Sequence, residues 1–103
     1  MMKRKVPELY YQRSRICRVL GNPTAYQILR TLTGARKTPS AIADELRLSL
    51  PTISIALRHL RQIDLVRYEN LRAGKAYFIK DDTIVSILNQ LELLVKRLRS
   101  REY

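Results

Sequence analysis

The sequence predicts a mainly α fold with one small β-hairpin (α+β), on the basis of three observations. Helical hydrophobic periodicity recurs in five separate stretches of the 103 residues. Glycine or a capping residue followed by proline marks several of the boundaries between these stretches. After Asp64 the periodicity changes to that of short strands. A chain of this length makes one ordinary domain, so we expect a single domain over residues 1–103.

The first predicted helix covers residues 8–20 and follows a basic tail over residues 1–7. It has one broad apolar face, made by Leu9, Ile16, Val19 and Leu20. Gly21 ends it, as glycine does past the C-terminus of a helix. The second predicted helix, 23–33, starts at Asn22-Pro23, a good N-cap followed by a proline suited to the first helical position. Its expected inward side chains are Tyr26, Ile28, Leu29 and Leu32.

Two helices follow over residues 39–46 and 50–62. Thr38-Pro39 repeats the cap-then-proline pattern, and Ser49 is the expected N-cap of the second helix. The apolar residues of this pair are Ile42, Ala43 and Leu46 in the first helix and the stripe Ile53, Leu57 and Leu60 in the second. Only a short turn, Arg47-Leu48-Ser49, separates the two helices.

Two strands are predicted next, over residues 65–69 and 75–80, around a turn at 70–74 that contains Gly74. Asp81-Asp82 then cap a last helix over residues 82–100. Its heptad seam consists of Ile84, Leu88, Leu91, Val95 and Leu98, with Ile87, Leu93 and Leu94 beside it.

The charge balance points to an acidic partner. Twenty Lys and Arg residues oppose nine Asp and Glu residues, which gives a formal charge of +11. A domain this basic is attracted to a polyanion, because neutralised phosphates release condensed counterions; a solvated Arg-rich surface is the alternative. No apolar run is long enough to span a bilayer, so we expect no membrane role. The single cysteine, Cys17, predicts a cytoplasmic location and a buried structural thiol.

Two tightly joined helices followed by a basic hairpin form a winged helix-turn-helix, with the helix-turn-helix over 39–62 and the wing over 65–80. One α-helix fits the major groove of duplex DNA, and the preceding helix holds it there. The candidate DNA-binding residues on helix 50–62 and its cap are Ser49, Thr52, Ser54, Ile55, Arg58, His59 and Arg61. Those of the wing are Arg67, Arg72 and Lys75. Arg58 is the predicted base-reading residue, since Arg bonds guanine O6 and N7 together.

Helices 8–20 and 82–100 carry more apolar residues than a thin core needs, so we expect them to form a homodimer interface. A two-fold dimer places two recognition helices roughly 34 Å apart, one turn of DNA, and predicts an inverted-repeat target.

Neither a cofactor nor a metal site is expected. One His, one Cys and scattered carboxylates do not form a metal-ligand set, and capping explains Asp81-Asp82 better than catalysis does. No nucleophile triad or Gly-rich phosphate cradle is evident, so an enzyme is not predicted.

The chain resembles the ArsR/SmtB family of repressors. Leu20-Gly21-Asn22-Pro23-Thr24 is similar to the family's opening motif, and Ile42-Ala43-Asp44-Glu45-Leu46-Arg47-Leu48-Ser49 to its third helix and turn. Pro51-Thr52-Ile53-Ser54 with Leu57-Arg58-His59-Leu60 resembles its recognition helix. Leu65-Val66-Arg67 and Gly74-Lys75-Ala76-Tyr77-Phe78-Ile79 resemble its wing. The resemblance covers about residues 16–80 and implies a DNA-binding dimer.

The departures from the family concern its effectors. Where metal-sensing members carry a Cys-x-Cys pair, this chain has Thr38 and Ser40, and helix 82–100 contains no His. Ile55 and Ala56 stand where the family often has Arg or His, which changes the base contacts expected there. The resemblance therefore implies a metal-independent repressor. Two alternatives stay open: an architectural protein that binds DNA without reading sequence, and a protein-interaction module.

Overall fold

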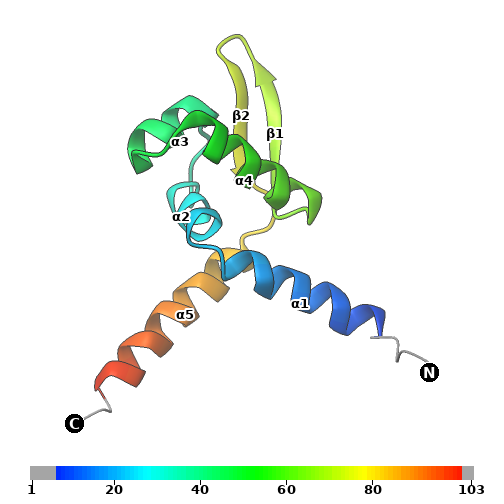
Figure 1. Ribbon diagram of the computed structural model, residues 1–103, viewed down its shortest axis with the longest axis vertical. Helices are drawn as coiled ribbons and strands as arrows, with labels where there is room; N and C mark the ends of the chain where they lie inside the picture. The colour runs from blue at the N-terminus through cyan, green and yellow to red at the C-terminus, as the bar shows by residue number, and fades with distance from the viewer. Residues whose placement is uncertain (1–6, 101–103) are drawn as a thin grey trace.

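The computed structural model describes residues 7–100 and contains five helices and one hairpin in the predicted order (Figure 1). The elements are α1 (Glu8–Leu20), α2 (Pro23–Thr31), α3 (Pro39–Leu46), α4 (Leu50–Gln62), β1 (Val66–Leu71), β2 (Gly74–Ile79) and α5 (Thr83–Ser100). The mainly α fold class with one β-hairpin is confirmed. Apart from Pro7, the predicted basic tail lies outside the described residues.

Side-chain caps define where three of the helices begin. The side chains of Asn22, Thr38 and Ser49 accept hydrogen bonds from the backbone N–H groups of Ala25, Ala41 and Thr52, at 3.0, 3.2 and 3.3 Å. In all three helices a proline occupies one of the first two positions, where its missing N–H costs nothing. The predicted caps of α2, α3 and α4 are thereby confirmed.

Six predicted boundaries differ from the structure by one or two residues: the end of helix 23–33, both ends of strand 65–69, both ends of strand 75–80 and the start of helix 82–100. Helix α2 ends at Thr31 rather than at residue 33, with Leu32 as its C-cap, and Gly34, with a φ of 70°, lies in the turn that follows. Strand β1 continues to Leu71, which pairs with Gly74, so the predicted turn over residues 70–74 shortens to a two-residue loop. Gly74 makes this reversal possible with a φ of 117°, a conformation that L side chains rarely adopt. Helix α5 begins at Thr83, whose N–H binds Oδ1 of Asp81 at 2.8 Å.

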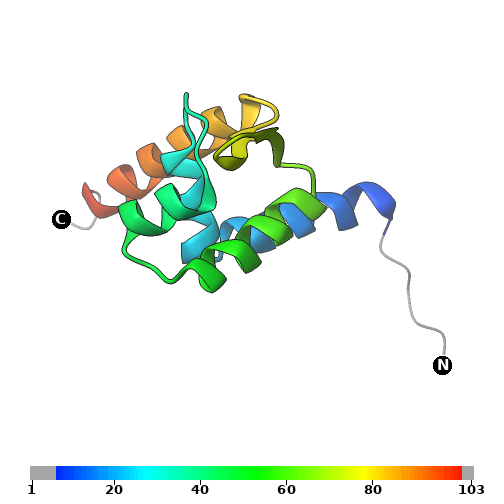
Figure 2. The same cartoon turned by 90° about the horizontal axis from the view of Figure 1, so that it is seen from above.

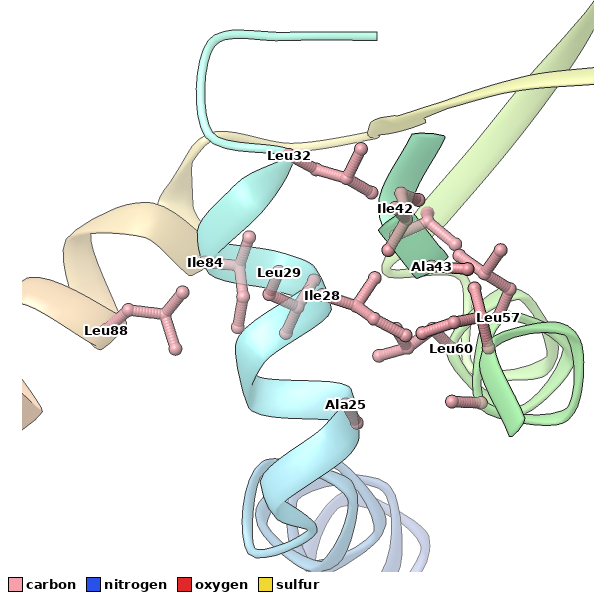
Figure 3. Packing of buried hydrophobic residues seen from close by; sticks show 13 residues of the cluster. Ala25, Ile28, Leu29, Leu32, Ile42, Ala43, Leu57, Leu60, Ile84 and Leu88 are labelled. Carbon is pink, nitrogen blue, oxygen red and sulfur yellow. The ribbon is translucent and has the colours of Figure 1, made fainter. Parts of the chain in front are cut away.

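Helix α2 lies at the centre of the core. Leu29 faces α5, where Ile84 and Leu88 are buried, and Ile28 faces α4 around Leu57 and Leu60 (Figure 3). The buried residues of the cluster also include Ala25, Leu32, Ile42, Ala43, Ile53, Ala56 and Val66. The predicted stripe of α4 is fully buried, which confirms it. Tyr26, expected to face inward, is only half-buried at the edge of this cluster.

The hairpin is tied to the segment that precedes α3. Lys37 and Tyr77 exchange two backbone hydrogen bonds, of 3.0 and 2.8 Å. Beside them the guanidinium of Arg36 lies over the ring of Phe78, 4.1 Å from its centroid. These contacts fix the wing against the helical core.

Helices α1 and α5 extend from the core in different directions and together form a V (Figure 1). No residue of α1 is buried, and α5 buries only Ile84 and Leu88. Cys17 is exposed on α1, so the prediction of a buried thiol was wrong for the single chain. Its neighbour Ile16 is half-buried, but no element of the described chain covers the outer side of α1. None of the described helices is long and apolar enough to cross a membrane.

Candidate nucleic-acid interface

The turn between α3 and α4 sets the orientation of α4. Arg47 takes a left-handed conformation with a φ of 57° and ends α3, and the N–H of Leu48 binds the carbonyl of Ala43 at 3.1 Å. Ser49 then caps α4 two residues after Arg47. Because Ile53, Leu57 and Leu60 are held in the core, the opposite face of α4 must point outward.

That outward face carries every candidate residue predicted on α4. The exposed side chains are Thr52, Ser54, Ile55, Arg58, His59 and Arg61, together with the cap Ser49. They form two rows at helical spacing: Ser54, Arg58 and Arg61 in one row, and Thr52, Ile55 and His59 in the other. Ile55 remains 49 % exposed, whereas Ala56 is buried and therefore takes no part in this face.

The three candidate cations of the wing do not form one cluster. Arg72 lies in the two-residue loop, and Lys75 lies one residue after Gly74 in β2. Arg67 lies near the base of the hairpin, opposite Phe78, where its Nε is 3.4 Å from Oδ1 of Asp64. The structure thus leaves Arg72 and Lys75 at the tip and places Arg67 near the α4–β1 turn.

Asp64 organises the base of the wing. Its carboxylate accepts hydrogen bonds from Lys80 and Arg67, and the bond from Lys80, followed by that from Arg67, lowers the pKa of Asp64 below its ordinary value of 3.8. The residue itself takes a φ of 63°, so the chain turns sharply from α4 into β1. Arg67 and Lys80 are therefore partly neutralised by one carboxylate.

Tyr68 is a functional candidate that the sequence analysis missed. The Arg61 guanidinium lies 5.3 Å from the centre of the Tyr68 ring, and the Lys75 ammonium 4.5 Å from it. The ring also packs against Tyr77, with 5.3 Å between centroids. One aromatic side chain thus positions a cation of α4 and a cation of the wing. The available signal was an aromatic residue on a strand among basic residues.

Thr38 and Ser40 stand where metal-sensing members of the family that the sequence resembles carry a Cys-x-Cys pair. The side-chain oxygen of Thr38 caps α3, and Ser40 is exposed on that helix. Over residues 7–100, no three His, Cys, Asp or Glu side chains come together in a way that would hold a metal ion.

A helix held in the core by a tightly joined partner, with a hairpin attached beside it, defines a winged helix-turn-helix protein. Residues 20–69 match the family model described as a helix-turn-helix domain. No curated protein matches the chain.

Solved structures with the same fold include three bacterial proteins. The homodimeric winged helix-turn-helix DNA-binding domain Mb0332 from Mycobacterium bovis, described as a possible ArsR-family transcriptional regulator, is 21% identical, with a TM-score of 0.82, covering 98% of this chain and 95% of that one. NolR from Sinorhizobium fredii is 24% identical, with a TM-score of 0.77 and coverage of 90% and 96%. The transcriptional repressor BigR from Xylella fastidiosa is 16% identical, with a TM-score of 0.76 and coverage of 82% and 87%. The winged helix-turn-helix fold predicted from the sequence is confirmed.

Proposed function

We propose that the protein is a sequence-specific transcriptional regulator that binds duplex DNA as a homodimer and represses without a metal effector. The observation that carries this proposal is the outward face of α4. Six candidate contact residues of α4 are exposed on this face, whereas Ile53, Leu57 and Leu60 on the opposite side are buried in the core. A helix presented in this way fits the major groove.

The side chains of that face suit DNA chemically. Arg58 reads guanine, the methyl groups of Ile55 contact thymine, and the hydroxyls of Ser49 and Thr52 bind phosphate at the start of α4. Arg72 and Lys75 at the wing tip meet the neighbouring backbone. The formal charge of +11 adds a long-range attraction to the duplex.

The homodimer is proposed from the uncovered apolar side chains of α1 and α5. The α5 residues Ile87, Leu91, Leu93, Leu94, Val95 and Leu98 are exposed, as are Leu9 and Tyr10 of α1. A row of exposed apolar side chains such as that of α5 marks an interaction site. The M. bovis domain with the same fold is homodimeric. A second copy of this chain on α1 and α5 would present two α4 helices to an inverted repeat.

Two further observations support the repressor role and the absence of a metal effector. One protein with this fold is a transcriptional repressor. Thr38 and Ser40 lack thiolates, and α5 contains no His. The protein would act in the cytoplasm, where an exposed thiol such as Cys17 stays reduced.

Selection of bound fragments from random duplex DNA tests the DNA-binding function. We expect an enriched inverted repeat, with an affinity at least about 1,000-fold above that for random duplex. Equal affinity for the selected site and for random duplex would instead favour an architectural protein that binds DNA without reading sequence. Failure to retain any duplex at low salt would favour a protein-interaction module.

Sedimentation of paired variants tests the dimer. Leu94→Glu places a charge in the exposed apolar surface of α5, and we expect it to shift the protein to monomers. Ser40→Glu adds the same charge at an exposed position of α3 and should leave the dimer intact. Equal sedimentation of the two variants would argue against an interface on α5.

A further inference from the structure

A groove of about 590 Å³ lies between α1 and α4. Both views show α1 running alongside α4 (Figures 1 and 2). The volume of the groove falls within the range of about 300–1,000 Å³ that small-molecule sites occupy. The groove adjoins the proposed DNA contacts, since Thr52, Ile55 and His59 of α4 line it.

The lining of the groove combines cations with apolar walls. Arg15 and Arg18 of α1 line one side, and His59 of α4 lines the other. The apolar part consists of Val19, Ala25, Ile55, Ala56 and Ile63. Among the described residues that line it, none is acidic. The groove therefore favours a ligand that is negatively charged at one end and apolar over the rest.

The two arginines are available for such a ligand. Within residues 7–100, neither Arg15 nor Arg18 takes part in a salt bridge. The guanidinium of Arg15 lies over the ring of Tyr11, 5.8 Å from its centre, and Tyr11 also lines the groove. Stacking restricts the Arg15 side chain before a ligand arrives, which lowers the entropy cost of binding.

This face of α1 is separate from the proposed dimer face. Arg15 and Arg18 are three residues apart and turn toward α4, whereas Leu9 and Ile16 lie seven apart on another side of the helix. Neither Leu9 nor Ile16 lines the groove. A second copy of the chain packed on the side of Leu9 would not need to contact the arginines that line the groove.

We propose that the groove binds a small organic carboxylate with an apolar body, and that the bound carboxylate competes with DNA. Arg15 and Arg18 hold the carboxylate, and Val19, Ala56 and Ile63 contact the apolar body. Competition arises because Thr52, Ile55 and His59 belong both to the groove and to the outward face of α4. This second part rests on the proposed function.

Calorimetric titration of the DNA-free protein tests the site directly. The probes are benzoate and octanoate, with benzamide as a neutral match and inorganic phosphate as a bare anion, all at one ionic strength. We expect one of the carboxylates to bind with a Kd of about 1 mM or tighter, and at least about tenfold more tightly than benzamide or phosphate. Binding of neither carboxylate, or equal binding of benzamide or phosphate, would overturn the proposal.

Charge-matched variants locate the bound carboxylate. The pair R15Q and R18Q, combined in one chain, should weaken binding at least about tenfold. Arg13→Gln combined with Lys96→Gln removes the same two charges at exposed positions outside the groove and should leave the affinity unchanged. Equal losses in both proteins would show that the probe binds through overall charge and would overturn the site.

Displacement of selected DNA by the binding carboxylate tests the coupling. Saturating carboxylate should lower DNA affinity about tenfold, and DNA should lower carboxylate affinity by the same factor. A carboxylate that binds without changing DNA affinity would refute the competition. If the protein binds no DNA at all, the proposed function fails, while the titration still decides whether the site exists.

Discussion

Arg30 of α2 donates a hydrogen bond from Nε to Oε2 of Glu92 on α5, at 2.5 Å. This bond joins the helical core to α5, one of the two helices of the proposed dimer interface. The Tyr26 hydroxyl donates to the same oxygen at 2.9 Å. A second nitrogen of Arg30 reaches Oδ1 of Asn89 at 2.7 Å. The bonds from Arg30 and then from Tyr26 lower the pKa of Glu92 below its ordinary value of 4.5. The first half of α5 is thus held by polar contacts as well as by Ile84 and Leu88.

This network predicts an acid-sensitive stability. Because the folded pKa of Glu92 lies below its unfolded value, its contribution to the free energy of unfolding is complete above about pH 5 and is lost as the pH falls through the folded pKa. We expect Glu92→Gln to lower stability at neutral pH and to flatten the decline in acid. Urea unfolding at one protein concentration measures both effects.

Asp44→Asn serves as the control for Glu92, since it removes an exposed carboxylate of α3. It should leave the acid decline close to that of the parent. If Glu92→Gln and Asp44→Asn give the same pH profile as the parent, Glu92 does not contribute to the pH dependence.

Removing the Arg58 guanidinium should weaken binding to the selected DNA by about 1–3 kcal/mol and relax the preference at one base pair. The structure leaves Arg58 exposed on the outward face of α4, so its loss should not unfold the protein. Affinities of Arg58→Ala for the selected site and for single-base variants of it give the result. Lys96→Ala, which removes a cation from α5, is the matched control. Unchanged affinity in Arg58→Ala would remove this residue from base reading.

Arg72→Gln at the wing tip should weaken binding by a similar factor for all duplex sequences and should lower the salt slope by about 1. Arg67→Gln should have the smaller effect, because the Arg67 side chain already pairs with Asp64 at the base of the wing. Plots of log affinity against log salt concentration compare the two variants. A larger slope change for Arg67→Gln would reverse the assignment of the tip as the phosphate contact.

Two substitutions at Ser49 separate its capping role from its proposed role on DNA. Ser49→Ala loses the cap on the Thr52 N–H and should cost about 1 kcal/mol of stability. Ser49→Asp keeps a good cap, so it should preserve stability, but its negative charge should weaken DNA binding. Thermal unfolding and DNA titration together distinguish these outcomes. Full DNA affinity in Ser49→Asp would place Ser49 away from the phosphates.

Much of the candidate interface could be predicted from local patterns. Ser49, Ile53 and Leu57 stand at positions where a cap and a helical stripe leave only one face of α4 outward, and that face is the one found. Other features escaped prediction because they depend on distant partners. The stacking of Arg61 and Lys75 on Tyr68 joins two elements through one ring, and neither hydrophobic period nor charge reveals it.

The amino-acid sequence by itself determined the number, type and order of the elements, since caps, prolines and apolar spacing act over a few residues. It also determined the +11 charge that favours a polyanion. Only the tertiary structure decided that Cys17 is exposed, that β1 reaches Leu71, and that Arg15 and Arg18 share a groove with α4. Those outcomes depend on how helices diverge and which strand register forms. Both result from contacts between residues far apart in the chain, which no local pattern records.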